Sequence, residues 1–140
     1  MDEKAQKLKR ICDAIVKDES LWPKKGATFC NFGLNLICQH MEYTGFSDMV
    51  ANEIYDKCVK VHAEISASWA EEYAKSGELA IAAQRGDPHG HCAVIYPDDG
   101  VFSGKWRMQV PLCANIGITC GVMGANYAFK TPPKYFAIKA

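Results

Sequence analysis

The stretch His89-Gly90-His91-Cys92-Ala93-Val94-Ile95-Tyr96-Pro97 is typical of a β-strand that begins beside an imidazole and stops at a proline. It belongs to the second half of the chain, where the spacing of apolar residues changes from a helical period to a period of two at Glu78. The further strands expected from this pattern are Leu79–Ala83, Trp106–Ala114, Asn126–Phe129 and a short terminal strand within Thr131–Ile138. We expect these consecutive segments to form an antiparallel sheet.

The first half of the chain carries the spacing of amphipathic helices. Thr28 is the expected N-cap of the second helix and Ser47 that of the third, because their side-chain oxygens can accept from first-turn N–H groups. The expected helices are Ala5–Lys17, a second from the Thr28 cap to about Glu42, a third after Ser47, and Ala63–Lys75. The buried side of the third helix is expected to carry Met49, Val50, Ile54, Cys58 and Val59. Helices first and strands second predict an α+β fold, with N-terminal helices packed on a small antiparallel β-sheet in a single domain over residues 1–140.

Three residues have the positions that cysteine hydrolysis requires. Cys30 opens the second helix, where the macrodipole and free N–H groups lower the pKa of a thiol and can bind an oxyanion. His91 comes from a separate strand and can accept the thiol proton, with His89 as the alternative base on the same face. Asn115 follows the neighbouring strand and can orient the imidazole by accepting from its far N–H. We therefore predict Cys30, His91 and Asn115 as catalytic residues.

The order of these segments resembles the papain-like NlpC/P60 and CHAP superfamily from roughly Thr28 to the C-terminus. A helix-capping Cys30, Gly90-His91 at the start of a strand and a polar Asn115 after the next strand carry the resemblance. It implies a papain-like fold and a cysteine peptidase or amidase. Members of the superfamily typically cleave peptidoglycan, within the stem peptide or at the amide that joins it to the glycan, and some cleave other amides or act as acyltransferases.

Two features depart from the usual motifs of that superfamily. The nucleophile motif of NlpC/P60 proteins is Asp-Cys-Ser-Gly, whereas this chain has Phe29-Cys30-Asn31-Phe32. Asn115 stands where many relatives use histidine. For substrate binding we expect Asn31, beside the oxyanion site, and the aromatic side chains of Trp22 and Trp106, although tryptophans in such positions are more often core or rim residues.

Neither a metal nor an organic cofactor is expected. The seven cysteines include no Cys-x-x-Cys pair, and most lie in apolar segments, as buried thiols do in a reducing compartment. Two alternatives to a hydrolase stay open. One is a non-catalytic module of the same fold that binds a cell-wall fragment or a protein partner, and the other is a metal-binding protein that uses Cys and His ligands.

Composition limits the partners that we expect. Sixteen basic and 16 acidic residues give no net charge, so nucleic-acid binding is not expected. No apolar run reaches the roughly 18 residues of a membrane span, and the N-terminus lacks the apolar core of a secretory signal. We expect a cytoplasmic protein as synthesised, which a non-classical route could export as a lysin or toxin. Peptidoglycan or a peptide would be its substrate, and an immunity or inhibitor protein a further partner.

Overall fold

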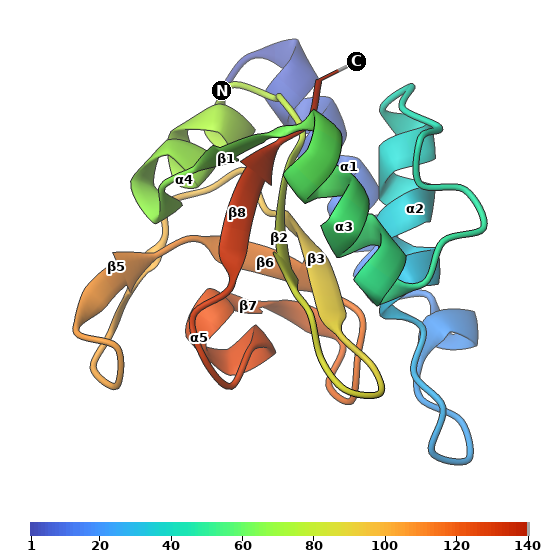
Figure 1. Ribbon diagram of the computed structural model, residues 1–140. Coiled ribbons are helices and arrows are strands. Elements are labelled where there is room, and N and C mark those ends of the chain that lie inside the picture. The colour runs from blue at the N-terminus through green and yellow to red at the C-terminus, as the bar shows by residue number, and fades with distance from the viewer. Residues whose placement is uncertain (140) are drawn as a thin grey trace.

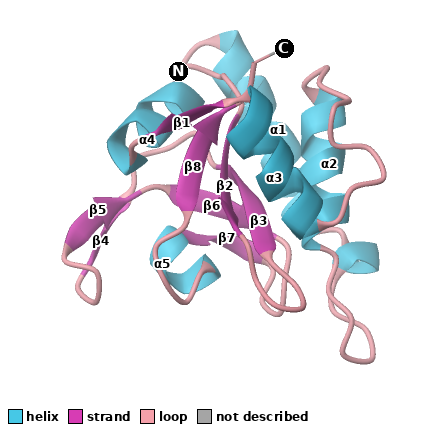
Figure 2. Cartoon of the chain, in the orientation of Figure 1, coloured by secondary structure: helices cyan, strands magenta, loops and turns pink. Residues whose placement is uncertain are grey.

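A computed structural model describes residues 1–139 and shows an antiparallel sheet with helices on both of its faces (Figures 1 and 2). The helices are α1 (Glu3–Val16), the 3-10 helix η1 (Glu19–Leu21), α2 (Cys30–His40), α3 (Ala51–Val61), α4 (Ala67–Lys75) and α5 (Ala125–Ala128). The expected α+β class, with helices packed on an antiparallel sheet, is confirmed.

The main sheet has six strands in the order β1-β8-β2-β3-β6-β7, and β4 and β5 form a separate hairpin. The strands are β1 (Ala63–Ile65), β2 (Ala80–Gln84), β3 (His91–Ile95), β4 (Val101–Ser103), β5 (Met108–Val110), β6 (Leu112–Asn115), β7 (Gly121–Gly124) and β8 (Lys134–Ala137). Strand β3 pairs with β2 on one side and with β6 on the other, where Val94 lies opposite Ala114. This pairing brings the first residue of β3 and the last residue of β6 to the same end of the sheet.

The two faces of the sheet carry separate apolar clusters. Cys92 and Val94 of β3 face α1, α2 and α3, where they join the larger cluster. Ala93 and Ile95, the alternate residues of the same strand, belong to the second cluster, beneath α4 and α5. Because successive strand residues point to opposite faces, β3 contributes to both clusters and is buried on both sides.

The strands expected at Leu79–Ala83, within His89–Pro97 and at the C-terminus are confirmed to within a residue or two. Three other expectations are wrong. The strand predicted over Trp106–Ala114 is broken at Pro111 into β5 and β6, because proline has no N–H to donate to a sheet ladder. Asn126–Phe129 falls largely in helix α5, and the start of the helix predicted over Ala63–Lys75 is instead β1, paired with β8.

Both predicted N-caps are wrong as well. Helix α2 begins at Cys30 with Phe29 as its N-cap, and Thr28 makes no cap. Helix α3 begins at Ala51, where the Glu53 side chain accepts from the N–H of Val50. Ser47 instead donates its hydroxyl to a carbonyl in its own turn. Within residues 1–139, no helix has the length and apolar character that crossing a membrane demands.

Candidate active site

The N-terminus of α2 places Cys30 against the start of β3. Gly33 allows this close approach, since a Cβ atom there would come within 2.5 Å of Ile116, just after β6. In the described chain no side chain caps α2, so the first N–H groups of the helix are left without an intrahelical acceptor or a side-chain partner. The lack of a side-chain cap on α2 therefore has a functional consequence, because uncapped N–H groups beside a thiol can bind an oxyanion.

His91 and Asn115 lie side by side at the ends of β3 and β6. The Nε2–H of His91 donates to Oδ1 of Asn115 over 2.7 Å. The amide of Asn115 is itself oriented by the carbonyl oxygen of Thr119, to which its Nδ2 donates over 2.8 Å. With Nδ2 used in this way, Oδ1 must face the imidazole and accept, which places a proton on Nε2 of His91. The other ring nitrogen, Nδ1, is then available to exchange a proton with Cys30.

The pKa of the buried Cys30 thiol is lowered by its neighbours. The largest cause is a hydrogen bond with the thiol of Cys92, followed by hydrogen bonding and charge attraction from His91. The backbone N–H of Cys92 contributes further, whereas burial acts in the opposite direction. The pKa of Cys92 is raised by the same hydrogen bond and by burial, so Cys92 stays protonated and donates to a Cys30 thiolate.

The imidazole of His91 is suited to pair with that thiolate. Burial alone lowers its pKa, but hydrogen bonding and charge attraction from Cys30, with the hydrogen bond to Asn115, raise the pKa above its ordinary value. The ring lies against Phe129, with 4.8 Å between ring centroids. A Cβ atom on Gly117 would come within 3.1 Å of Cε1 of His91 and 3.4 Å of Nδ2 of Asn115, so a larger residue would press on both.

The structure thus brings Cys30, His91 and Asn115 together and places the other expected residues elsewhere. Asn31 lies beside the nucleophile, where its Nδ2 donates to the carbonyl of Met49 over 3.0 Å. Trp22 is part-exposed in the loop after α1, and its indole N–H donates to the carbonyl of Val16. The alternative base, His89, is exposed in the turn before β3.

Trp106 lies in the turn of the β4–β5 hairpin and packs against the apolar cluster beneath α4 and α5. That cluster is on the opposite face of the sheet from α2, so the structure does not bring Trp106 to Cys30 (Figure 1). The position of Trp106 therefore does not support the prediction that it lines a substrate groove around Cys30.

Sequence reasoning missed three residues that shape this site: Cys92, Thr119 and Gly117. Cys92 follows His91 and points to the face of the sheet that α1, α2 and α3 cover. The alternation of side chains along a strand could have revealed this once α2 was placed on that face. Thr119 and Gly117 lie in the turn between β6 and β7. Strand β7 was not predicted, because two of its four residues are glycines, which are rare in strands.

Neither a protein-family model nor a curated protein matches this chain. Within residues 1–139, each of the seven cysteines is a free thiol, and no three His, Cys, Asp or Glu side chains are grouped so that they could hold a metal ion. What the arrangement offers is a thiolate, an imidazolium oriented by an amide, and free N–H groups at a helix terminus.

Proposed function

We propose that this protein is a cysteine hydrolase that cleaves amide bonds through an acyl-enzyme intermediate. One observation carries the proposal: the chain of contacts from Cys30 through His91 to Asn115 and on to Thr119. A nucleophile, a base and a group that orients the base form the unit on which nucleophilic catalysis depends.

In the first half of the reaction, the Cys30 thiolate attacks the carbonyl carbon of the amide. A C–S bond forms, and the carbonyl electron pair moves to oxygen, where the N–H groups at the start of α2 stabilise the negative charge. The tetrahedral intermediate collapses as the C–N bond breaks. The proton on Nδ1 of His91 goes to the leaving nitrogen, so that a neutral amine departs and a thioester remains on Cys30.

In the second half, Nδ1 of the neutral imidazole takes a proton from water as the water oxygen attacks the thioester carbonyl. The C–S bond then breaks, the acid product leaves, and the thiolate and imidazolium are restored. Asn115 keeps the proton on Nε2 throughout, so that Nδ1 always faces the reaction. Neither half of the cycle needs a cofactor.

The substrate that we propose is peptidoglycan, cut in the stem peptide or at the amide that joins it to the glycan. Support comes from the resemblance of the Cys30, Gly90-His91 and Asn115 pattern to NlpC/P60 and CHAP proteins, and from helices packed on an antiparallel sheet as a papain-like fold requires. Action on a cell wall would require export of the protein by a non-classical route. An immunity or inhibitor protein in the producing cell would then be a natural partner.

The experiment that tests this function is digestion of purified peptidoglycan by the wild-type protein and by Cys30→Ala, with products identified by mass spectrometry. We expect stem-peptide fragments from the wild type alone, and the masses identify the bond. The control is Cys113→Ala, which removes a buried thiol from the other face of the sheet. Absence of products from the wild type, or equal products from Cys30→Ala, would contradict the proposal.

A further inference from the structure

A second thiol lies against the candidate nucleophile. Cys30 is the first residue of α2, Cys92 is the second residue of β3, and a hydrogen bond joins their thiols. Both side chains belong to the apolar cluster that fills the space between the sheet and helices α1, α2 and α3. Two cysteines from separate elements whose thiols touch can form a disulfide once one of them is oxidised.

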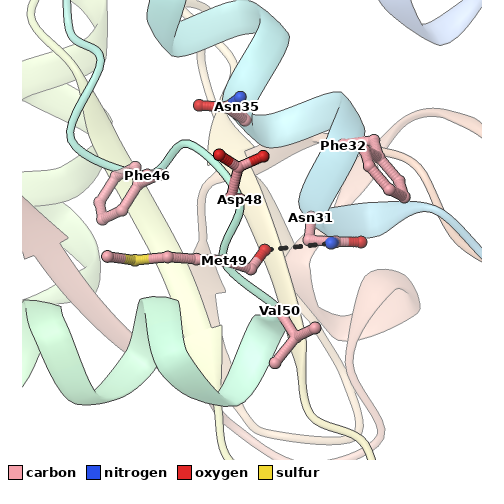
Figure 3. A pocket seen from close by; sticks show the side chains of 7 residues that line it. All are labelled: Asn31, Phe32, Asn35, Phe46, Asp48, Met49 and Val50. Carbon is pink, nitrogen blue, oxygen red and sulfur yellow. Dashed lines mark hydrogen bonds between the residues drawn. The ribbon is translucent and has the colours of Figure 1, made fainter.

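The first turn of α2 is held on two sides. Gly33 lets the helix approach Ile116 so closely that a Cβ atom on this glycine would come within 2.5 Å of the isoleucine side chain. On another side, Nδ2 of Asn31 donates to the carbonyl oxygen of Met49 over 3.0 Å, at the edge of a pocket between α2 and the loop before α3 (Figure 3). The contact between the two thiols is therefore set by the packing of α2 on the sheet.

Burial and charge give the two thiols different roles. Cys30 is 8% exposed and Cys92 is 1% exposed, so a small reagent that enters the active site meets Cys30, and Cys92 reacts only through Cys30. The neighbours of Cys30 lower its pKa, whereas the pKa of Cys92 is raised and its sulfur stays a thiol. Redox-sensitive cysteines combine thiolate character with a nearby cysteine that reacts with the first oxidation product.

The remaining cysteines do not fit either role. Burial raises the pKa of three thiols in the same cluster, which therefore stay protonated and react slowly with oxidants: Cys12, Cys38 and Cys58. Cys113 belongs to the cluster on the opposite face of the sheet. Cys120 is part-exposed, and its thiol donates to a backbone carbonyl in its own turn over 3.6 Å. The nucleophile thus has one thiol partner in position.

We propose that Cys30 and Cys92 form a reversible disulfide when the protein meets a hydroperoxide, and that this bond blocks the active site. In the first step, the Cys30 thiolate attacks one oxygen of the hydroperoxide. An S–O bond forms as the O–O bond breaks, and the leaving oxygen takes the Nδ1 proton of His91. The sulfur loses two electrons to the peroxide, and the products are a sulfenic acid on Cys30 and water, or an alcohol from an organic hydroperoxide.

In the second step, the sulfur of Cys92 attacks the sulfur of the sulfenic acid. An S–S bond forms as the S–O bond breaks, and the departing oxygen takes the Cys92 proton and leaves as water. A dithiol reductant reverses the reaction by thiol–disulfide exchange and returns two electrons and two protons. The linked protein has no thiolate at Cys30 and cannot hydrolyse an amide. Only this loss of hydrolysis rests on the proposed function, since the disulfide itself can be measured without a substrate.

The test is mass mapping of the folded wild-type protein after treatment with hydrogen peroxide at about neutral pH. Once the peroxide is removed, iodoacetamide blocks the free thiols of the denatured protein. Trypsin then separates the two cysteines, with Cys30 in residues 26–57 and Cys92 in residues 86–105. We expect these two peptides to be joined by a disulfide, hydrolysis of peptidoglycan to be lost in proportion to the joined fraction, and dithiothreitol to reverse both changes.

Two variants sharpen the assignment. Residues 26–57 also contain Cys38, so Cys38→Ala is the matched control and should still give the joined peptides. Cys92→Ser lacks the thiol that captures the sulfenic acid. In this variant Cys30 should pass on to the sulfinic acid, which adds the mass of two oxygen atoms and is not reversed by dithiothreitol.

The outcomes separate the two proposals. Oxidation of wild-type Cys30 to the sulfinic acid without joined peptides, no oxidation of Cys30, or a disulfide to residues 108–130 would each overturn the inference. Loss of the joined peptides in Cys38→Ala would assign the bond to Cys38 and overturn it as well. Joined peptides in a protein that never hydrolyses peptidoglycan would keep the disulfide and contradict the proposed function.

Discussion

The two ends of helix α2 carry the same buried side chain in different surroundings. Cys30 at the N-terminal end has a lowered pKa because Cys92 and His91 stabilise its thiolate. Cys38, two turns further along, has a raised pKa because burial and the neighbouring Cys58 both disfavour charge there. Burial by itself therefore raises the pKa of a thiol in this protein, and the contact of α2 with the start of β3 is what lowers the pKa of Cys30.

The largest effect is expected from removal of one thiol or the other. Cys30→Ala should reduce amide hydrolysis by about a thousandfold or more, because the nucleophile is lost. Cys38→Ala should leave hydrolysis within about twofold and lower the free energy of unfolding by about 1 kcal/mol, through lost packing. Turnover assays and urea denaturation measure the two effects. Equal activities of Cys30→Ala and Cys38→Ala would contradict the claim that Cys30, and not Cys38, is the nucleophile.

The next largest effect concerns the group that orients the imidazole. Asn115→Ala removes the acceptor of the His91 Nε2–H, and we expect kcat to fall by about a hundredfold with little change in KM. Asn126→Ala, which truncates another amide with a buried oxygen, serves as the control and should keep kcat near that of the wild type. If both variants lose the same activity, Asn115 acts through general stability and has no orienting role.

The contribution of Cys92 predicts a change in pH dependence. The rate should rise with pH as Cys30 loses its proton and fall as His91 loses its own above its raised pKa, which gives a bell-shaped profile. Cys92→Ala removes a donor to the thiolate, so the pKa of Cys30 rises and the acid limb moves to higher pH. A shift of one pKa unit corresponds to a roughly tenfold loss of rate on the acid limb, below the lowered Cys30 pKa of about 4, while the rate at about pH 6 stays near that of the wild type.

Cys92→Ser is the matched variant for this prediction, because its hydroxyl can still donate. It should return the acid limb toward its wild-type position. An acid limb that is unchanged in Cys92→Ala would show that the neighbouring thiol has no part in lowering the pKa of Cys30.

The smallest effect is expected at Gly117, whose missing side chain leaves room for the imidazole. Gly117→Ala places a methyl group 3.1 Å from Cε1 of His91, and we expect kcat to fall by a few fold as the ring shifts. Gly104→Ala, where nothing lies within 4 Å of the added Cβ, should leave kcat unchanged. An equal response of the two variants would mean that the position of His91 tolerates displacement.

The sequence allowed parts of this arrangement to be predicted. Helix α1 has a long stripe of regularly spaced apolar residues and β3 has a continuous apolar run, and both were expected close to where they lie. Short elements were missed, because β1 has only three residues and is a strand only through its pairing with β8. The same holds for β7, whose glycines carry no strand signal of their own.

The three candidate catalytic residues were predicted from their places at the ends of elements, and the structure brings them together. Their supporting contacts could not be predicted, since each depends on how elements pack. Cys92 touches Cys30 only because Gly33 lets α2 approach the sheet, and Thr119 orients Asn115 only because the chain turns back into β7. Trp106 was misjudged because the face of the sheet on which a hairpin lies is not encoded in local spacing.

The central claim is that Cys30, unlike Cys38, is a thiolate paired with an imidazolium near neutral pH. The most direct measurement is the rate of iodoacetamide alkylation of each cysteine in the folded protein from about pH 5 to pH 9, mapped by peptide mass spectrometry. We predict that Cys30 alone is alkylated rapidly at about pH 6, and that His91→Ala moves its reaction to the ordinary thiol range. Alkylation of Cys30 that begins only near its ordinary pKa, or that does not change in His91→Ala, would contradict the account.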